Sequence, residues 1–76
     1  MNNDTLVRMA NQIAEFFDAM PEREQALHDI ADHLRKFWEP RMRRQLLEHL
    51  DRGGEGLSAS LLEAVRAHRE ALAPQP

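Results

Sequence analysis

Residues 34–50 read Leu-Arg-Lys-Phe-Trp-Glu-Pro-Arg-Met-Arg-Arg-Gln-Leu-Leu-Glu-His-Leu, and this stretch decides how the chain folds. It holds the only tryptophan, Trp38, and the only lysine, Lys36. Residues 35–44, here called the elbow, carry five basic side chains and one acid, a charge of +4. The rest of the chain carries five bases and twelve acids, or −7. Because Pro40 ends one apolar stripe and begins another, the elbow is predicted to join two helices.

Apolar residues recur three and four positions apart along most of the chain, which is the spacing of one face of a helix. These stripes are separated at Pro21, at Pro40 and at the glycine-rich run 53–56. Asn3 or Asp4 is expected to cap the first helix. The pattern predicts an all-α fold, a small four-helix domain of short amphipathic helices near residues 4–19, 22–38, 40–52 and 58–72.

The chain is short enough for a single helical domain, residues 1–76, with one core and a tail at 73–76 that is expected to fray. Gly53 suits the C-terminal end of the third helix, and Ser58 suits the N-cap of the fourth. Trp38 shares a stripe with core positions, so a core role and a partner-facing role both stay open. The predicted core consists of large apolar residues on the stripes: Leu6, Met9, Ile13, Phe16, Phe17, Leu27, Ile30, Leu34, Phe37, Leu46, Leu50, Leu61 and Val65.

Composition excludes several classes of site. The chain has no cysteine, so it forms no disulfide, thiolate zinc site or cysteine-ligated iron–sulfur cluster. A net charge of −3 argues against general binding to nucleic acid or to anionic membranes. No apolar run is long enough to span a bilayer, and the first residues do not form a secretory signal. The expected location is the cytoplasm.

The most catalytic-looking string is His28-Asp29-Ile30-Ala31-Asp32-His33. Its two histidines lie about 140° apart around a helix, too far round to face one ion. Pairs of His28 with Asp32 and of Asp29 with His33, four residues apart on the polar side, are expected instead. Neither Ser58 nor the serine at position 60 belongs to a recognisable nucleophile motif. We therefore predict no catalytic, cofactor or metal site.

Arginine and tryptophan are residue types that anchor protein–protein interfaces, and the elbow is rich in both. Val7, Asn11 and Ala14 form a second strip on the first helix that either faces solvent or docks another chain. Arg43 is expected to stack on the indole of Trp38 and so fix the elbow, with lying along the helix toward water as the alternative. The predicted partner-binding residues are Val7, Asn11, His33, Arg35, Lys36, Trp38, Arg41 and Arg43.

Three blocks of the chain carry a family resemblance. The first is residues 6–14, Leu-Val-Arg-Met-Ala-Asn-Gln-Ile-Ala, followed by two phenylalanines. The second is residues 30–38, Ile-Ala-Asp-His-Leu-Arg-Lys-Phe-Trp, followed by Pro-Arg-Met-Arg at 40–43. The third is Gly-Glu-Gly-Leu at 54–57, with Ala-Val-Arg at 64–66. Together these blocks resemble the delta subunit of the NAD-dependent formate dehydrogenases that contain molybdenum or tungsten.

The resemblance implies an accessory subunit that is not itself an enzyme and carries no cofactor. It implies binding to the large molybdopterin-containing subunit, whose assembly or stability the chain would support. A homodimer is also expected in isolation, because so short a chain covers little apolar surface. Nucleic acid and membrane are not expected partners. The alternative is a small helical nucleic-acid-binding or regulatory module, in which the second and third helices act as a helix-turn-helix.

Overall fold

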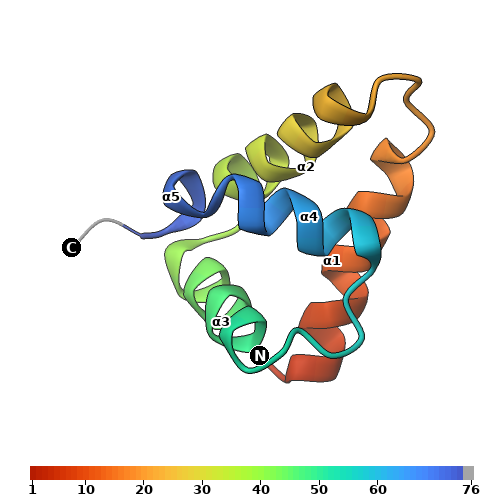
Figure 1. The fold of residues 1–76 in the computed structure, drawn as a ribbon. Coiled ribbons are helices and arrows are strands. Elements are labelled where there is room, and N and C mark those ends of the chain that lie inside the picture. Colours follow the sequence, from red (N-terminus) through yellow and green to blue (C-terminus); the bar gives the residue numbers. More distant parts are fainter. Residues whose placement is uncertain (75–76) are drawn as a thin grey trace.

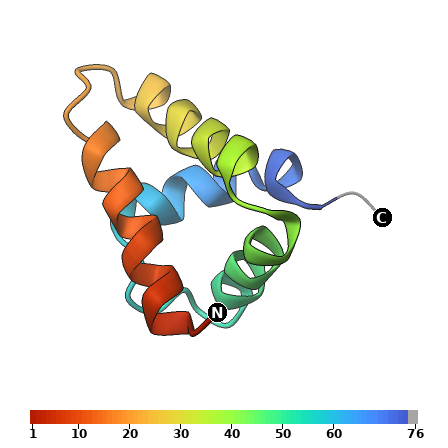
Figure 2. The same cartoon turned by 180° about the vertical axis from the view of Figure 1, so that it is seen from behind.

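The computed structural model describes residues 1–74, and within them five helices follow one another without any strand. This confirms the all-α prediction. Figures 1 and 2 show α1 and α2 joined by a loop and diverging from it, α4 crossing one face of the pair, and α3 closing the end opposite that loop. The helices are α1 (Asn3–Phe17), α2 (Arg23–Phe37), α3 (Pro40–Asp51), α4 (Ala59–Ala67) and α5 (Arg69–Leu72).

Helix α1 begins one residue earlier than expected. Asn2 is its N-cap, in an extended conformation, and its side-chain oxygen accepts a hydrogen bond of 3.1 Å from the Thr5 N–H. Asp4 therefore lies inside the first turn, where its negative charge is favourable, and does not cap the helix. The helix also ends earlier, at Phe17, and the carboxylate of the following Asp18 accepts a hydrogen bond from Ser60 on α4.

Two extended residues form the bend inside the elbow. Trp38 (φ −90°, ψ 130°) ends α2, and Glu39 (φ −67°, ψ 159°) precedes α3. Pro40 opens α3, where its fixed φ suits a helix and its missing N–H leaves no donor unpaired. The predicted proline junction is thus confirmed.

The turn between α3 and α4 needs glycine. The Gly53 N–H bonds to the Leu50 carbonyl and the Gly54 N–H to the His49 carbonyl, each at 3.0 Å, which is the Schellman arrangement at a helix end. Gly54 has a φ of +65°, and a Cβ there would lie 2.8 Å from the nearest carbon of Leu62. Ser58 then caps α4, as predicted, by accepting from the Leu61 N–H. The turn is therefore fixed by local sequence.

The predicted fourth helix is divided at His68, whose φ of −117° and ψ of 28° are not helical. The bend sets α5 against α2 and α3 (Figure 1). It also buries Leu72, which a straight helix would carry on past the core. The tail at 73–76 was expected to fray, but its first residue, Ala73, packs against this core. Residues 75–76 of the tail lie outside the described residues.

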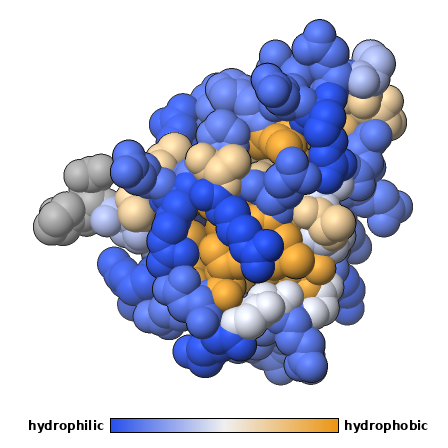
Figure 3. Space-filling model, in the orientation of Figure 1, coloured by the Kyte–Doolittle hydropathy of each residue, from blue (hydrophilic) through white to orange (hydrophobic). Residues whose placement is uncertain are grey.

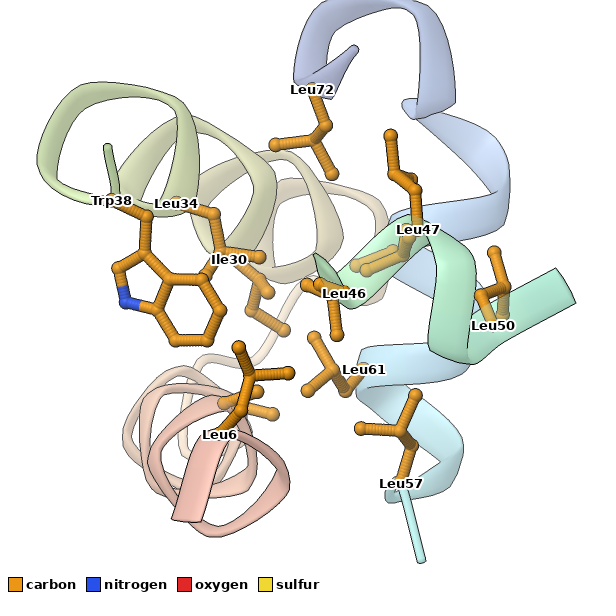
Figure 4. Close-up of a cluster of buried hydrophobic side chains, with 14 of the residues drawn as sticks. Leu6, Ile30, Leu34, Trp38, Leu46, Leu47, Leu50, Leu57, Leu61 and Leu72 are labelled. Atoms are coloured by element: carbon orange, nitrogen blue, oxygen red, sulfur yellow. The ribbon is translucent and has the colours of Figure 1, made fainter. Parts of the chain in front are cut away.

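The core is largely aliphatic, and Figure 4 shows its leucines converging from all five helices around Ile30. Helix α1 turns its small residues inward: Ala10 and Ala14 are fully buried beside Leu6, which lets neighbouring helices approach closely. Eight predicted core residues are confirmed as buried: Leu6, Leu27, Ile30, Leu34, Leu46, Leu50, Leu61 and Val65.

The prediction was wrong for two phenylalanines. Phe16 is 75% exposed and Phe37 is 71% exposed. Three further predicted core residues, Met9, Ile13 and Phe17, are only partly buried. For Phe16 and the partly buried residues of α1, the reason is that α1 carries two neighbouring apolar stripes, and the one with alanines packs more closely. Phe37 is the last residue of α2. Among the described residues, no helix is long and apolar enough to cross a membrane.

Candidate partner-binding site

The two exposed phenylalanines flank an apolar groove of about 730 Å³. Helix α1 supplies one side of the groove, the end of α2 the other, and the start of α3 one end. Figure 2 shows how these three helices are placed relative to one another. We call it the aromatic groove, lined by Met1, Met9, Gln12, Ile13, Phe16, Phe17, His33, Phe37, Trp38 and Met42.

The groove and the core are built from different residue types. The chain has three phenylalanines, one tryptophan and no tyrosine, and all four of these aromatic side chains line the aromatic groove. Three of the four methionines line it as well. The buried core, by contrast, is built from leucine, alanine, isoleucine and valine, with Trp38 the one aromatic. Aromatic residues and methionine are enriched at the centres of protein–protein interfaces, so the groove has the composition of a binding surface.

The aromatic rings form a chain across the groove. Phe16 and Phe17 pack edge to face with centroids 5.1 Å apart, and Phe17 meets His33 of α2 at 6.1 Å. His33 in turn lies 4.7 Å from Phe37. The predicted partner residue His33 is therefore inside the groove, held by the rings on either side. Such contacts orient the exposed faces before any partner arrives.

Trp38 has its bulk in the core and one edge in the groove. Only 6% of it is exposed, and it packs in the central cluster beside Leu6 and Leu34 (Figure 4). In the isolated chain the core role left open by the sequence is the one observed. The indole also lines the aromatic groove and so supports its end nearest the elbow.

Arg43 takes a different position from the one expected. Its Nε donates to the Trp38 carbonyl at 3.2 Å, and its Nη1 donates to the Leu72 carbonyl, also at 3.2 Å. The guanidinium therefore holds the backbone of the elbow to α5, and the predicted role of stacking on the indole is corrected to a main-chain tether. The fork of donors on arginine suits two carbonyls at once.

Of the other bases in the elbow, some are paired with a carboxylate and some are not. Arg35 and Lys36 both reach Asp32, at 3.1 and 2.9 Å, and hydrogen bonds from Lys36 and then Arg35 lower the pKa of that carboxyl. Asp32 therefore does not pair with His28 as predicted. Arg41 is exposed and has no carboxylate partner within residues 1–74.

The other predicted histidine pair is also replaced. Asp29 accepts a hydrogen bond of 2.8 Å from Gln25, and His28 lies 3.3 Å from the same oxygen. The ring of His28 meets that of His68 across the helices, with centroids 5.9 Å apart. Within the part of the chain that the structure describes, no three His, Cys, Asp or Glu side chains are grouped so as to hold a metal ion.

The strip formed by Val7, Asn11 and Ala14 is covered by the chain itself. The Asn11 amide donates to the Gly56 carbonyl and accepts from the Ser58 N–H, both at 2.9 Å. Ala14 is fully buried, and Val7 lies against Gly56. The strip does dock a segment, but that segment is the α3–α4 turn, which corrects both alternatives that the sequence left open.

Ser60 acquires polar neighbours that its sequence does not suggest. Its hydroxyl donates to Asp18 and accepts from Arg23, which also bonds to Glu63 at 2.7 Å. Because both of its hydrogen-bonding roles are used, the hydroxyl serves to join α4 to the α1–α2 loop. These contacts give Ser60 a structural role.

A second apolar patch reaches the surface between α3 and α4, in mostly hydrophilic surroundings (Figure 3). Three leucines of these helices, Leu47, Leu50 and Leu61, are each less than a tenth exposed. The aromatic groove exposes far larger side chains, so it is the stronger candidate for a binding surface.

A comparison with protein families gives one match. The model of the NADH-dependent formate dehydrogenase delta subunit FdsD matches residues 5–65. That range covers most of α1 and α4, all of α2 and α3, and all of the groove-lining residues except Met1. No curated protein and no solved structure was found to match the chain.

Proposed function

This chain belongs to the family of NADH-dependent formate dehydrogenase delta subunits, and from that premise we propose that it is a non-catalytic accessory subunit. Membership of a formate dehydrogenase complex makes other subunits of that enzyme its partners. The proposed partner is the large, molybdopterin-bearing subunit, and the proposed place of action is the cytoplasm. The proposed effect is to stabilise that subunit or to assist its assembly.

The aromatic groove is the observation that carries this proposal. Phe16 and Phe37 stand mostly exposed beside methionines, in a chain that buries its aliphatic residues well. Moving one phenylalanine side chain out of water is favourable by about 1.5–3 kcal/mol. A partner that covers both phenylalanines therefore gains a substantial favourable contribution to the free energy of binding.

Stabilisation would follow from mass action. A subunit that binds only the folded, assembled form of its partner stabilises that form by about 2.7 kcal/mol at a hundred times its dissociation constant. The mechanism needs no reacting group on this chain. It requires only that the groove fit the folded partner better than the unfolded one.

The experiment that tests the proposal is production of the other formate dehydrogenase subunits with and without this chain. We expect less assembled complex without it, measured by size-exclusion chromatography and by the molybdenum and iron content. We also expect unchanged turnover of formate per bound molybdenum. Full assembly with a lower turnover per molybdenum would contradict the non-catalytic role.

The groove is tested separately with the double variant Phe16→Ser, Phe37→Ser. Both residues are exposed, so the variant should fold normally while losing co-purification with the other subunits. The matched control is Ala67→Ser, Ala71→Ser, which changes two exposed apolar residues on α4 and α5 outside the groove. Equal recovery of the complex with both variants would exclude the groove as the contact surface.

A further inference from the structure

We propose that the aromatic groove receives an amphipathic helix from another subunit of the enzyme, with acidic side chains beside its apolar stripe. The inference rests on the proposed function and adds the form and the charge of the bound segment. It draws on the spacing of the lining residues and on the charges next to them.

The shape of the groove fits a helix. Helix α1 contributes residues 9, 12, 13 and 16, spaced i, i+3, i+4 and i+7, and α2 contributes residues 33 and 37, spaced i, i+4. Side chains at these spacings lie on one face of a helix and are what one helix offers to a neighbouring helix. Within residues 1–74, no further helix covers this stripe of α1, because Phe16 remains 75% exposed. The lining methionines can adapt to the shape of an incoming side chain.

Three exposed bases lie one position before lining residues. Arg8 precedes Met9, Lys36 precedes Phe37 and Arg41 precedes Met42. One step along a helix turns by about 100°, so each of these exposed bases lies on the strip next to a groove position.

Four acids also lie next to lining residues: Glu15 before Phe16, Asp18 after Phe17, Asp32 before His33 and Glu39 after Trp38. Asp32 is already bonded to Arg35 and Lys36. Arg8 and Arg41, by contrast, have no carboxylate partner in the part of the chain that the structure describes. The excess of positive charge lies at the elbow end of the groove, which Phe37, Trp38 and Met42 line, because residues 35–44 carry a net charge of +4. This end complements a negatively charged partner.

Arg41 is also placed unfavourably within its own helix. It lies in the first turn of α3, which contains no acidic residue. A positive charge at this end of a helix is repelled by the aligned peptide dipoles. A carboxylate on the partner would offset both the arginine and the dipole.

The charge pattern also distinguishes this occupant from a second copy of the chain. A twofold dimer formed over the groove would place the same patch on both sides of the interface. The interface would then contain two positively charged elbows, one from each copy, which repel each other. An acidic helix meets the same apolar surface without that repulsion.

The charge is tested with Arg41→Glu, compared with Arg44→Glu on the same helix. Arg44 is exposed and lies about 160° around α3 from the groove residue Met42. In titrations of the purified chain with the rest of the enzyme, we expect Arg41→Glu to weaken binding about fivefold or more at low salt. The difference should vanish near 1 M salt, where charges are screened within about 3 Å. Arg44→Glu should change binding less than twofold.

Misfolding is controlled within the same experiment. A glutamate in the first turn favours the helix, so Arg41→Glu should unfold at a higher temperature than the natural chain. Weaker binding by a more stable variant then reports on the interface. Equal effects of the two substitutions, or an effect that persists at high salt, would overturn the acidic partner.

The occupant is identified by placing a photo-reactive amino acid at Phe37 in the assembled enzyme and mapping the cross-links by mass spectrometry. We expect one segment of another subunit, apolar at helical spacing with Asp or Glu beside the stripe. Cross-links to a second copy, or to a segment without that pattern, would overturn the inference. If the other subunits bind but position 37 does not cross-link to them, this inference fails while the proposed function stands. If they do not bind the chain at all, both fail.

Discussion

Asn11 joins two parts of the chain that lie far apart in sequence. It comes directly after the buried Ala10 in α1, yet its side-chain amide bonds to Gly56 and Ser58, which are 45 and 47 residues away. One donor and one acceptor of a single side chain thereby satisfy a carbonyl and an N–H in the α3–α4 turn. Both Asn11 and this turn belong to the family blocks of the sequence, and the structure shows that they contact each other.

Replacing Asn11 with leucine should therefore destabilise the fold. Leucine is similar in size but offers neither hydrogen bond, which leaves the Gly56 carbonyl and the Ser58 N–H unpaired. We expect a loss of about 1–3 kcal/mol in the free energy of unfolding, measured by urea titration. Gln12→Ala, one residue along and exposed, should stay within about 0.5 kcal/mol. Similar losses for the two variants would contradict the assigned role.

At the scale of elements, the α3–α4 turn depends on a backbone shape that only glycine adopts easily. Gly54 has a positive φ and lies against Leu62, Leu57 and Leu50. An added Cβ would strain the backbone and also press on the end of Leu62. The turn therefore sets the path of the chain from α3 to α4.

Gly54→Ala should lower the free energy of unfolding by about 1–3 kcal/mol, because a left-handed conformation costs an L-residue about 1–2 kcal/mol before any clash. Thermal and urea unfolding followed by circular dichroism would measure it. The control is Glu55→Ala, the exposed neighbour, which has no positive φ. A stability of Gly54→Ala equal to that of this control would show that the turn relaxes freely.

Helix α5 is tied to α3 by a two-point ion pair. The Arg69 guanidinium donates to both carboxylate oxygens of Asp51, at 2.9 and 2.8 Å. These hydrogen bonds are the main reason that the pKa of Asp51 lies below its usual value. A lowered pKa in the folded state means that the carboxylate stabilises the fold above its unfolded pKa of about 3.9. That contribution is lost as the pH falls through the folded pKa.

Asp51→Asn should accordingly lower the melting temperature at pH 7, and this difference should shrink as the pH falls through the lowered pKa of the folded Asp51. The loss at pH 7 should be small and should shrink with added salt, since the pair is exposed. Melting curves from pH 2 to pH 7 would measure it, with Glu48→Gln on the exposed face of α3 as the control. A constant difference at every pH would contradict the ion pair as the cause.

At the scale of the whole molecule, the chain encloses a largely aliphatic core and leaves two phenylalanines exposed on one surface. A domain of this size has too little interior to cover every large side chain. Because the small and branched residues face inward, the core is closely packed. Phe16 and Phe37 are left for another molecule to cover.

In the absence of its partners, the purified chain should self-associate weakly over the aromatic groove. Because the interface of such a dimer would contain two positively charged elbows, association should strengthen as salt is added. Sedimentation equilibrium across a range of concentrations and salt would measure this. Phe16→Ser, Phe37→Ser should remain monomeric. A natural chain that is monomeric at high concentration in every salt would contradict the prediction.

The sequence by itself determined the features that depend on neighbouring residues. It located the helices to within a few residues, the proline elbow, the glycine turn and the Ser58 cap, because these follow from backbone preferences and local hydrogen bonds. It also indicated the family, through the short blocks of specific residues that the family comparison matches.

Only the tertiary structure decided which stripe of α1 faces inward. Its two apolar stripes lie side by side, and local periodicity does not distinguish them. The choice depends on how closely α2, α3 and α4 can pack, and alanine allows the closer approach. Of the predicted partner residues, only His33 and Trp38 line the groove, and Arg43 and Asn11 bind backbone far away in sequence. Contacts of that kind are set by the arrangement of distant helices in space, which no spacing along the chain encodes.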